Sequence, residues 1–293
     1  MQLNHLGIIA ARGADARRFL NGQLSQDVMA LRTDRVELAG LHNPQGRLLA
    51  VMHLVAQGDA DVLLILRREL LGATLAALSR YVLRAKLKLS DETDAWRLSG
   101  YLPTDALLPD PAARLPAEAG AALETAAGTI WRHAADGRII ELTSAAADRA
   151  APPPGDSSQH DRWHAADIAA GLPVVYAATA GEFVAQMLNL DAVGGISFTK
   201  GCYTGQEVIA RAHYRGRVKR RLQRFSINDL LPSESTASST SVDDWLIGAQ
   251  VKLADGRSAQ LVDVGPREIS PRECLAVTTF DLPSLPLGYP LPE

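Results

Sequence analysis

The sequence of 293 residues predicts an α+β protein with a smaller all-β part at its C-terminal end. In the first half, short apolar runs separated by turn residues precede a leucine pattern with helical spacing. The last quarter contains short strand-like runs and turns, without a long helical pattern. Between these parts, residues 152–155 read Pro-Pro-Pro-Gly, a run that neither a helix nor a central strand tolerates. We therefore expect a boundary or crossover there.

The first third predicts strands followed by a covering helix. Residues 6–11 are apolar and predict a strand, after which Asp15 can cap a short helix. Two further apolar runs, 48–56 and 62–66, predict strands joined by a tight turn at a Gly-Asp pair. Leucines at helical spacing then predict a helix over residues 67–83.

The second half predicts a hairpin, a helix and a set of short strands. Residues 130–142 form a hairpin centred on Asp136 and Gly137, because this pair tolerates tight two-residue turns. Ser158 can cap a helix that Gly171 ends. Later strands are expected at 218–227, 251–253, 260–264 and 274–280.

The composition is that of an ordinary globular protein. The hydrophobic fraction is 47% and the formal net charge is −3. Cys202 and Cys274 are the only cysteines and no CxxC spacing occurs, so neither a disulfide framework nor a self-contained metal site is predicted. No secretory signal pattern or membrane-length apolar run is found, and a cytoplasmic location is expected.

The most informative motif is residues 200–207, Lys-Gly-Cys-Tyr-Thr-Gly-Gln-Glu. Thr204 and Glu207 have capping-box spacing, which predicts the start of a helix. Cys202 would then lie just before that helix and beside Lys200. Both the helix N-terminus and the ammonium group favour a thiolate, so we interpret Cys202 and Lys200 as the catalytic pair.

A basic run follows this motif and indicates contact with an anion. If the segment is a strand, four of its residues lie on one side: Arg215, Arg217, Lys219 and Arg221. Such a stripe could bind folate glutamates, an RNA backbone or an acidic partner protein. Few aromatic residues are interleaved, so sequence-specific RNA reading is poorly supported.

Residues 167–221 closely resemble the signature region of the YgfZ-type proteins, and residues 19–28 and 43–47 match the same family in the same order. These proteins are a folate-binding branch of the superfamily that contains the glycine-cleavage aminomethyltransferase, or T protein. The resemblance implies a T-protein-like folate-binding core over 1–220 and a small antiparallel β-barrel over 221–293. Within the core, segments 1–40 and 150–220 would enclose a ferredoxin-like half at 41–149.

The resemblance also implies the site residues. Trp163 matches a folate-contacting tryptophan of the family, whereas Leu6 replaces a second one. We expect Trp163 and Cys202 to border one pterin-sized cleft. The expected folate contacts are Trp163, Tyr203, Gln206, Glu207, Asp27, Gln23, Arg47 and Arg211. The same residues have structural alternatives: core packing for Trp163, helix capping for Glu207 and local turn capping for Asp27.

Three functions are compatible with these patterns. The family resemblance implies a folate-binding accessory protein in iron–sulfur cluster assembly or repair, with an indirect effect on tRNA modification and iron–sulfur proteins or assembly factors as partners. One cysteine cannot complete a cluster, so any cluster would be shared. The alternatives are a tetrahydrofolate-dependent aminomethyl or methyl transferase, for which no carboxylate base can be assigned, and a non-enzymatic RNA-binding protein.

Overall fold

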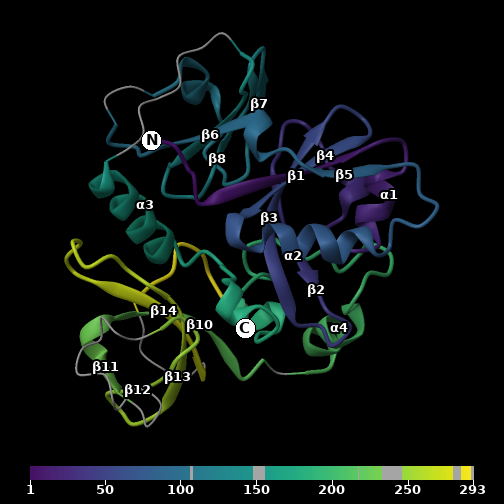
Figure 1. The fold of residues 1–293 in the computed structure, drawn as a ribbon. Helices are drawn as coiled ribbons and strands as arrows, with labels where there is room; N and C mark the ends of the chain where they lie inside the picture. The colour runs from purple at the N-terminus through teal and green to yellow at the C-terminus, as the bar shows by residue number, and fades with distance from the viewer. Residues whose placement is uncertain (106–107, 148–155, 217, 233–245, 280–284, 292–293) are drawn as a thin grey trace.

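The computed structural model describes residues 1–105, 108–147, 156–216, 218–232, 246–279 and 285–291 (Figure 1). The predicted Pro-rich linker and Arg217 of the basic run lie outside the described residues. Three antiparallel sheets make up the fold, and α3 (Ser157–Ala170) lies between the second and third of them in Figure 1. Within the described ranges, no helix combines the length and the apolar character needed to cross a membrane.

The first sheet has five strands in the order β2-β3-β4-β1-β5. Its strands are β1 Leu6–Arg12, β2 Glu37–His42, β3 Leu48–Gln57, β4 Asp61–Arg67 and β5 Lys88–Asp91. Two helices accompany it, α1 Ala16–Asn21 and α2 Arg68–Ser79. All neighbouring pairs are antiparallel, and β1 aligns Ile8 with Ile65 of β4.

The other two sheets follow in the chain. The second has the order β6-β9-β8-β7, with β6 Trp96–Tyr101, β7 Ala122–Thr125, β8 Gly128–Arg132 and β9 Ile139–Ser144. After α4 (Gln206–Tyr214), the third has the order β10-β14-β13-β12-β11. Its strands are β10 Arg220–Ser226, β11 Leu230–Pro232, β12 Gln250–Leu253, β13 Ser258–Val264 and β14 Glu273–Thr279.

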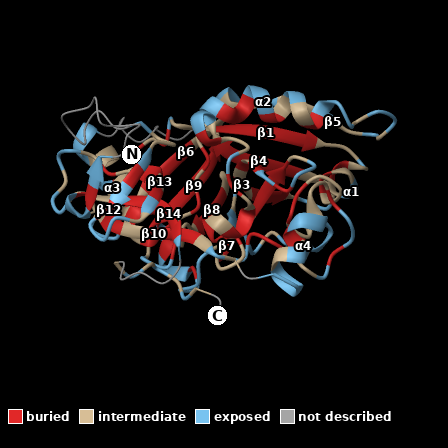
Figure 2. Cartoon of the chain, turned by 90° about the horizontal axis from the view of Figure 1, so that it is seen from below, coloured by how far each residue is buried: buried red, intermediate tan, exposed pale blue. Residues whose placement is uncertain are grey.

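The strands β1, β3 and β4 of the first sheet are buried on both faces, so their sequences are nearly continuous apolar runs (Figure 2). Side chains alternate between the faces along a strand. In β1, Ile9 and Ala11 belong to a large core that also contains Tyr203. Ile8 and Ala10 belong to a second core, shared with the second sheet and Trp163. Trp163 and Tyr203 therefore lie on opposite sides of this sheet.

The predicted α+β character is confirmed, and each element predicted above has a counterpart. The hairpin of β8 and β9 differs in its turn, because residues 133–138 join the strands instead of a tight two-residue turn. Helix α3 begins after Asp156, whose Oδ1 accepts a hydrogen bond from Gln159 N at 2.8 Å, so the predicted cap at Ser158 is wrong. Gly171 ends the helix in the left-handed region, as expected. Five strands were not predicted: β2, β5, β6, β7 and β11.

The finer fold predictions are not confirmed. In the expected ferredoxin-like half, β3 pairs with β4, and β4 pairs with β1 of the preceding segment in one sheet, whereas β6 to β9 form another. In the third sheet, β10 and β11 are the two ends of the ladder, and no described pairing joins them into a closed barrel. The division into domains at residue 220 stays a prediction.

Arg221 does not belong to an exposed basic stripe, which corrects that part of the sequence interpretation. Its side chain is 7% exposed and forms a two-point ion pair with Asp191, with Nη1–Oδ1 and Nη2–Oδ2 distances of 2.9 and 3.0 Å. The strand begins at Arg220, so Arg215 precedes it. The Arg221 pair instead joins the third sheet to the loop beside the large core.

We expect Arg221→Met to lower the free energy of unfolding by about 3–5 kcal/mol, because it leaves the Asp191 carboxylate buried without its partner. Urea denaturation followed by circular dichroism measures this change. The matched control is Arg215→Met at an exposed position, expected to change stability by less than about 0.5 kcal/mol. Equal stability of the two variants would contradict the structural role of Arg221.

Candidate functional site

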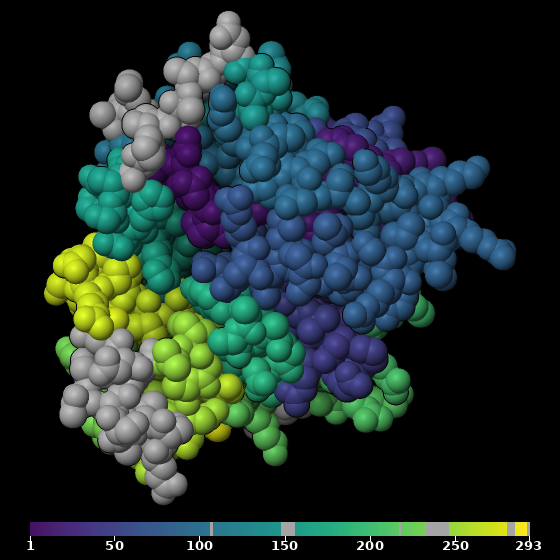
Figure 3. Space-filling model, viewed as in Figure 1, coloured from purple at the N-terminus to yellow at the C-terminus, as the bar shows by residue number. Residues whose placement is uncertain are grey.

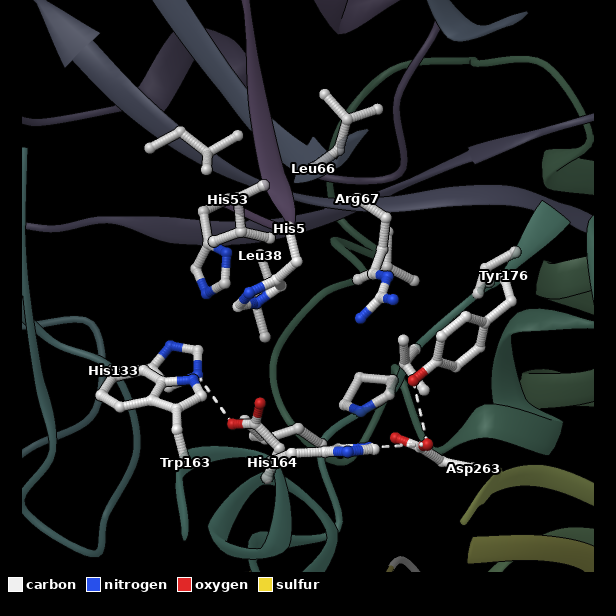
Figure 4. Close-up of a pocket in the computed structure, with 18 of the residues that line it drawn as sticks. His5, Leu38, His53, Leu66, Arg67, His133, Trp163, His164, Tyr176 and Asp263 are labelled. Carbon is white, nitrogen blue, oxygen red and sulfur yellow. Dashed lines mark hydrogen bonds and ion pairs between the residues drawn. The ribbon is translucent and has the colours of Figure 1, made fainter. Parts of the chain in front are cut away.

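A cavity of about 100 Å³ lies against the face of the first sheet that turns toward α3, and all three sheets contribute to its wall (Figure 4). We call it the inter-sheet cavity. Apolar side chains form much of the wall, among them Leu38 and Ile140. Polar side chains converge on it from the N-terminal segment, β3, β4, the loop after β8, α3, the segment after α3 and β13: His5, His53, Arg67, His133, His164, Asp167, Tyr176 and Asp263.

His5 and His53 point toward the middle of the cavity (Figure 4). Burial, with Arg67 nearby, lowers the pKa of His5 to about 4. Burial, with His133 nearby, lowers the pKa of His53 to about 3. Both rings are thus neutral at pH 7, and each offers one N–H donor and one acceptor nitrogen. This combination suits an uncharged polar ligand.

Asp167 supplies a carboxylate held in place from one side. Its Oδ1 accepts hydrogen bonds from Arg138 Nη1 and from His133 Nε2, the latter at 3.2 Å. Burial favours the neutral acid, but the charge of Arg138 and the His133 contact outweigh it and hold the pKa well below its usual range. No hydrogen bond joins Oδ2 to another described residue, and the side chain is 25% exposed in the wall of the cavity. Oδ2 can therefore accept from a ligand.

Trp163 lines the cavity but is itself 2% exposed. The His133 ring stacks on the indole with centroids 5.4 Å apart, and the Arg138 guanidinium lies 4.8 Å from its ring centre. A side chain at Gly100 would also approach the indole to 2.8 Å. Trp163 is consequently a packed member of the second core that also lines the cavity, and its contact with folate stays a prediction.

A polar cluster closes the cavity toward the third sheet. Asp263 Oδ1 accepts from Tyr176 OH at 2.9 Å and lies 2.8 Å from His164 Nε2 (Figure 4). Burial opposes protonation of His164, but the Asp263 carboxylate outweighs it and raises the pKa. Arg67 lies 4.2 Å from the Tyr176 ring centre, and its Nε makes no hydrogen bond within the described structure. Asp263 of the third sheet thus holds two side chains of the cavity wall, His164 and Tyr176, in place.

The motif around Cys202 occupies a different place. Cys202 is exposed and does not line the inter-sheet cavity, and the adjacent Tyr203 packs in the large core on the other side of the first sheet. The prediction that Trp163 and Cys202 border one cleft is therefore wrong. The first sheet separates them, because Trp163 packs in the core on one of its faces and Tyr203 in the core on the other.

Helix α4 begins at Gln206, four residues after the thiol, so Cys202 does precede a helix. The predicted capping box is wrong, because the N-cap is Gly205 in the left-handed region and no side chain caps the helix. A Cβ at Gly205 would lie 2.7 Å from Asn43 O. Only glycine permits this approach between the motif and the turn at residues 43–46.

Lys200 fastens the motif to the chain near residues 21–26. Its Nζ donates to the carbonyl oxygens of Asn21, Leu24 and Gln26, the last two at 2.7 and 2.9 Å. Burial lowers the pKa of Lys200 to about 8, against the opposing effect of Asp27. Most Lys200 side chains are thus charged at pH 7. The segments 19–28, 43–47 and 200–207 therefore lie next to one another. The three hydrogen bonds of Lys200 give this residue a structural role.

The remaining predicted folate contacts gather near this motif and do not line the inter-sheet cavity. Asp27 Oδ1 accepts from Met29 N and Ala30 N, which is its expected alternative role as a local cap. The Arg47 guanidinium donates to Glu182 O. The others belong to this cluster through their places beside α1 or in α4 and its preceding loop: Gln23, Tyr203, Gln206, Glu207 and Arg211.

Sequence reasoning missed most of the polar wall. Four of the seven histidines line the inter-sheet cavity: His5, His53, His133 and His164. His53 carried a usable signal, because it interrupts the otherwise apolar strand Leu48–Gln57 on the face that turns toward the second sheet. Within the described residues, no group of three His, Cys, Asp or Glu side chains is arranged to hold a metal ion.

The chain is similar to named bacterial proteins along most of its length, although no protein-family profile matches it. The tRNA-modifying protein YgfZ of Escherichia coli O157:H7 is 33% identical over 270 residues, which cover 88% of this chain and 82% of the relative. The YgfZ of E. coli O7:K1 is 32% identical with the same coverage. The fold is similar to that of the glycine cleavage system aminomethyltransferase T from Bartonella henselae, with a TM-score of 0.59, 13% identity and coverage of 95% of this chain and 77% of the other.

We expect Lys200→Met to lower the free energy of unfolding by about 2–3 kcal/mol, because three carbonyl groups lose a charged donor. Thermal and urea unfolding measure the loss. Lys219→Met, at an exposed position, is the control and is expected to be close to neutral. If Lys200→Met unfolded like the wild type but lost function, Lys200 would be a chemical rather than a structural residue.

Proposed function

This chain belongs to the YgfZ family, and we propose that it binds a folate in the inter-sheet cavity and serves as an accessory protein in iron–sulfur cluster assembly or repair, with an indirect effect on tRNA modification. The observation that carries the folate part is the Asp167 carboxylate, whose Oδ2 is accessible in a cavity with neutral imidazoles and apolar walls. A pterin ring combines a flat apolar surface with adjacent N–H donors, which a carboxylate accepts well.

The size of the cavity supports a pterin-sized occupant. A buried water needs a cavity of at least roughly 10–15 Å³, so about 100 Å³ is several times that minimum. A ring-sized part of a folate is the occupant that we expect there, and not the whole molecule. Asp167, His5 and His53 would hold the ring, and the bound folate would supply one-carbon or redox chemistry.

The electrostatics of Asp167 disfavour the alternative of a folate-dependent transferase that uses this carboxylate as its base. A general base works best when its pKa is near the operating pH. Arg138 and His133 hold the pKa of Asp167 far below that range. The carboxylate is therefore suited to accepting hydrogen bonds and is a weak acceptor of a proton.

The exposed thiol supports the maturation role. Cys202 lies at the surface before α4, and Val208 and Tyr214 of that helix are also exposed. Because one thiolate cannot hold a cluster alone, Cys202 would act together with ligands from a client or assembly protein. The separation of thiol and cavity by the first sheet means that folate acts on this chemistry through the protein and not by direct contact.

We expect Asp167→Asn to weaken tetrahydrofolate binding at least about tenfold, because an amide oxygen is a poorer acceptor than a carboxylate. Isothermal titration calorimetry measures the affinity, and circular dichroism verifies the fold. Asp27→Asn is the matched control, since its carboxylate caps a loop outside the cavity. If Asp27→Asn weakened binding and Asp167→Asn did not, the folate site would lie beside the Cys202 motif.

We expect Cys202→Ala to abolish complementation of a deletion strain, measured as the activity of several cluster-containing enzymes, without changing thermal stability. Removing an exposed side chain costs little folding energy. Cys274→Ala is an informative comparison: this thiol is buried in the third sheet, so its loss should reduce stability. Full complementation by Cys202→Ala would remove the thiol from the mechanism.

A further inference from the structure

A second, larger cavity lies beside the inter-sheet cavity. Its volume is about 340 Å³, and it is lined by the N-terminal segment, β1, the start of α2, β6 and the turn before β6. Ile8 and Leu98 in its wall belong to the same core as Trp163. Both cavities therefore lie on the same side of the first sheet. Figure 3 shows the N-terminal residues, in purple, reaching the surface between α3 and the blue residues of the first half.

The two cavities share one wall residue, Leu6. Near Leu6, neighbouring polar residues of the chain line different cavities. Asn4 lines the second cavity and His5 the first, and Arg68 lines the second while Arg67 lines the first. Leu6 is thus the residue that separates the two cavities, and a ligand longer than a bicyclic ring would reach the larger one by passing it.

The second cavity is suited to an anion. Arg68 and Arg97 contribute two guanidinium groups to its wall. Asp94 is the acidic residue in the wall, and it lies 3.9 Å from Arg68 with a fully exposed side chain. An exposed ion pair at this distance contributes little, so a carboxylate that enters the cavity can replace it. The Arg68 side chain is itself 55% exposed.

We propose that the second cavity binds the glutamate end of the folate whose ring lies in the inter-sheet cavity, with Arg68 contacting its carboxylates. This inference rests on the proposed function. It assigns the two ends of one molecule to two adjacent cavities on one side of β1: the uncharged ring to neutral imidazoles and Asp167, and the dicarboxylate tail to arginine. Arg68 is then a specificity residue that separates folates from free pterins.

The test compares two ligands, tetrahydrofolate and 6-methyltetrahydropterin, which share the reduced ring but differ in the tail. Calorimetric titration of the full-length protein measures both affinities. We expect Arg68→Gln to weaken tetrahydrofolate binding about tenfold, through loss of a charge-assisted pair, and to leave pterin binding within about twofold. Asp94→Asn should have the opposite effect on affinity: it removes the carboxylate beside Arg68 and tightens tetrahydrofolate binding at low salt.

Arg80→Gln is the control, because it removes an exposed arginine at the other end of α2. If the wild type binds both ligands but Arg68→Gln affects tetrahydrofolate no more than Arg80→Gln does, the tail site is wrong and the folate proposal stands. If Arg68→Gln weakens both ligands equally, Arg68 does not read the tail, and the inference is again wrong. If the wild type binds neither ligand, both proposals fail.

Discussion

Burial of the first sheet on both of its faces is the constraint on which the arrangement of functional groups depends. Each strand must send alternate side chains into two different cores, so neighbours in the sequence lie on opposite sides of the sheet. The inter-sheet cavity and Trp163 lie on one side. The motif with Cys202 is anchored on the other, through Tyr203. Under the proposed function, a folate in the cavity therefore acts on the thiol through a packed sheet.

The polar residues of the cavity are compatible with this packing because most of them are paired. Arg138 is 1% exposed and would be costly to bury alone, but it pairs with Asp136 and Asp167 and lies over Trp163. His164 and Tyr176 share Asp263 in the same way. Within the described structure, the polar groups of the wall that make no hydrogen bond include the rings of His5 and His53, one oxygen of Asp167 and Nε of Arg67. These are the groups that a ligand can use.

Most elements could be predicted because their signals are local. The apolar runs of β1, β3 and β4, the Gly171 stop and the turn at Gly137 depend on neighbouring residues. Among the strands that were missed, β7 at Ala122–Thr125 has only four residues and lies in alanine-rich, weakly patterned sequence. The cap of α4 was mispredicted because the local pattern of Thr204 and Glu207 gave no sign that Gly205 must lie against Asn43 O. That is a long-range contact.

The amino-acid sequence by itself determined the family, the α+β character and the residues worth testing, because motifs such as 200–207 are contiguous. Only the tertiary structure decided which of those residues act together. It placed Lys200 on three backbone carbonyls, Asp27 in a loop cap and Cys202 apart from Trp163. It also gathered His5, His53 and Asp167, which are far apart in the chain. Sequence spacing cannot specify such a site, because strand pairing and the two-sided burial of a sheet set the distances between its parts.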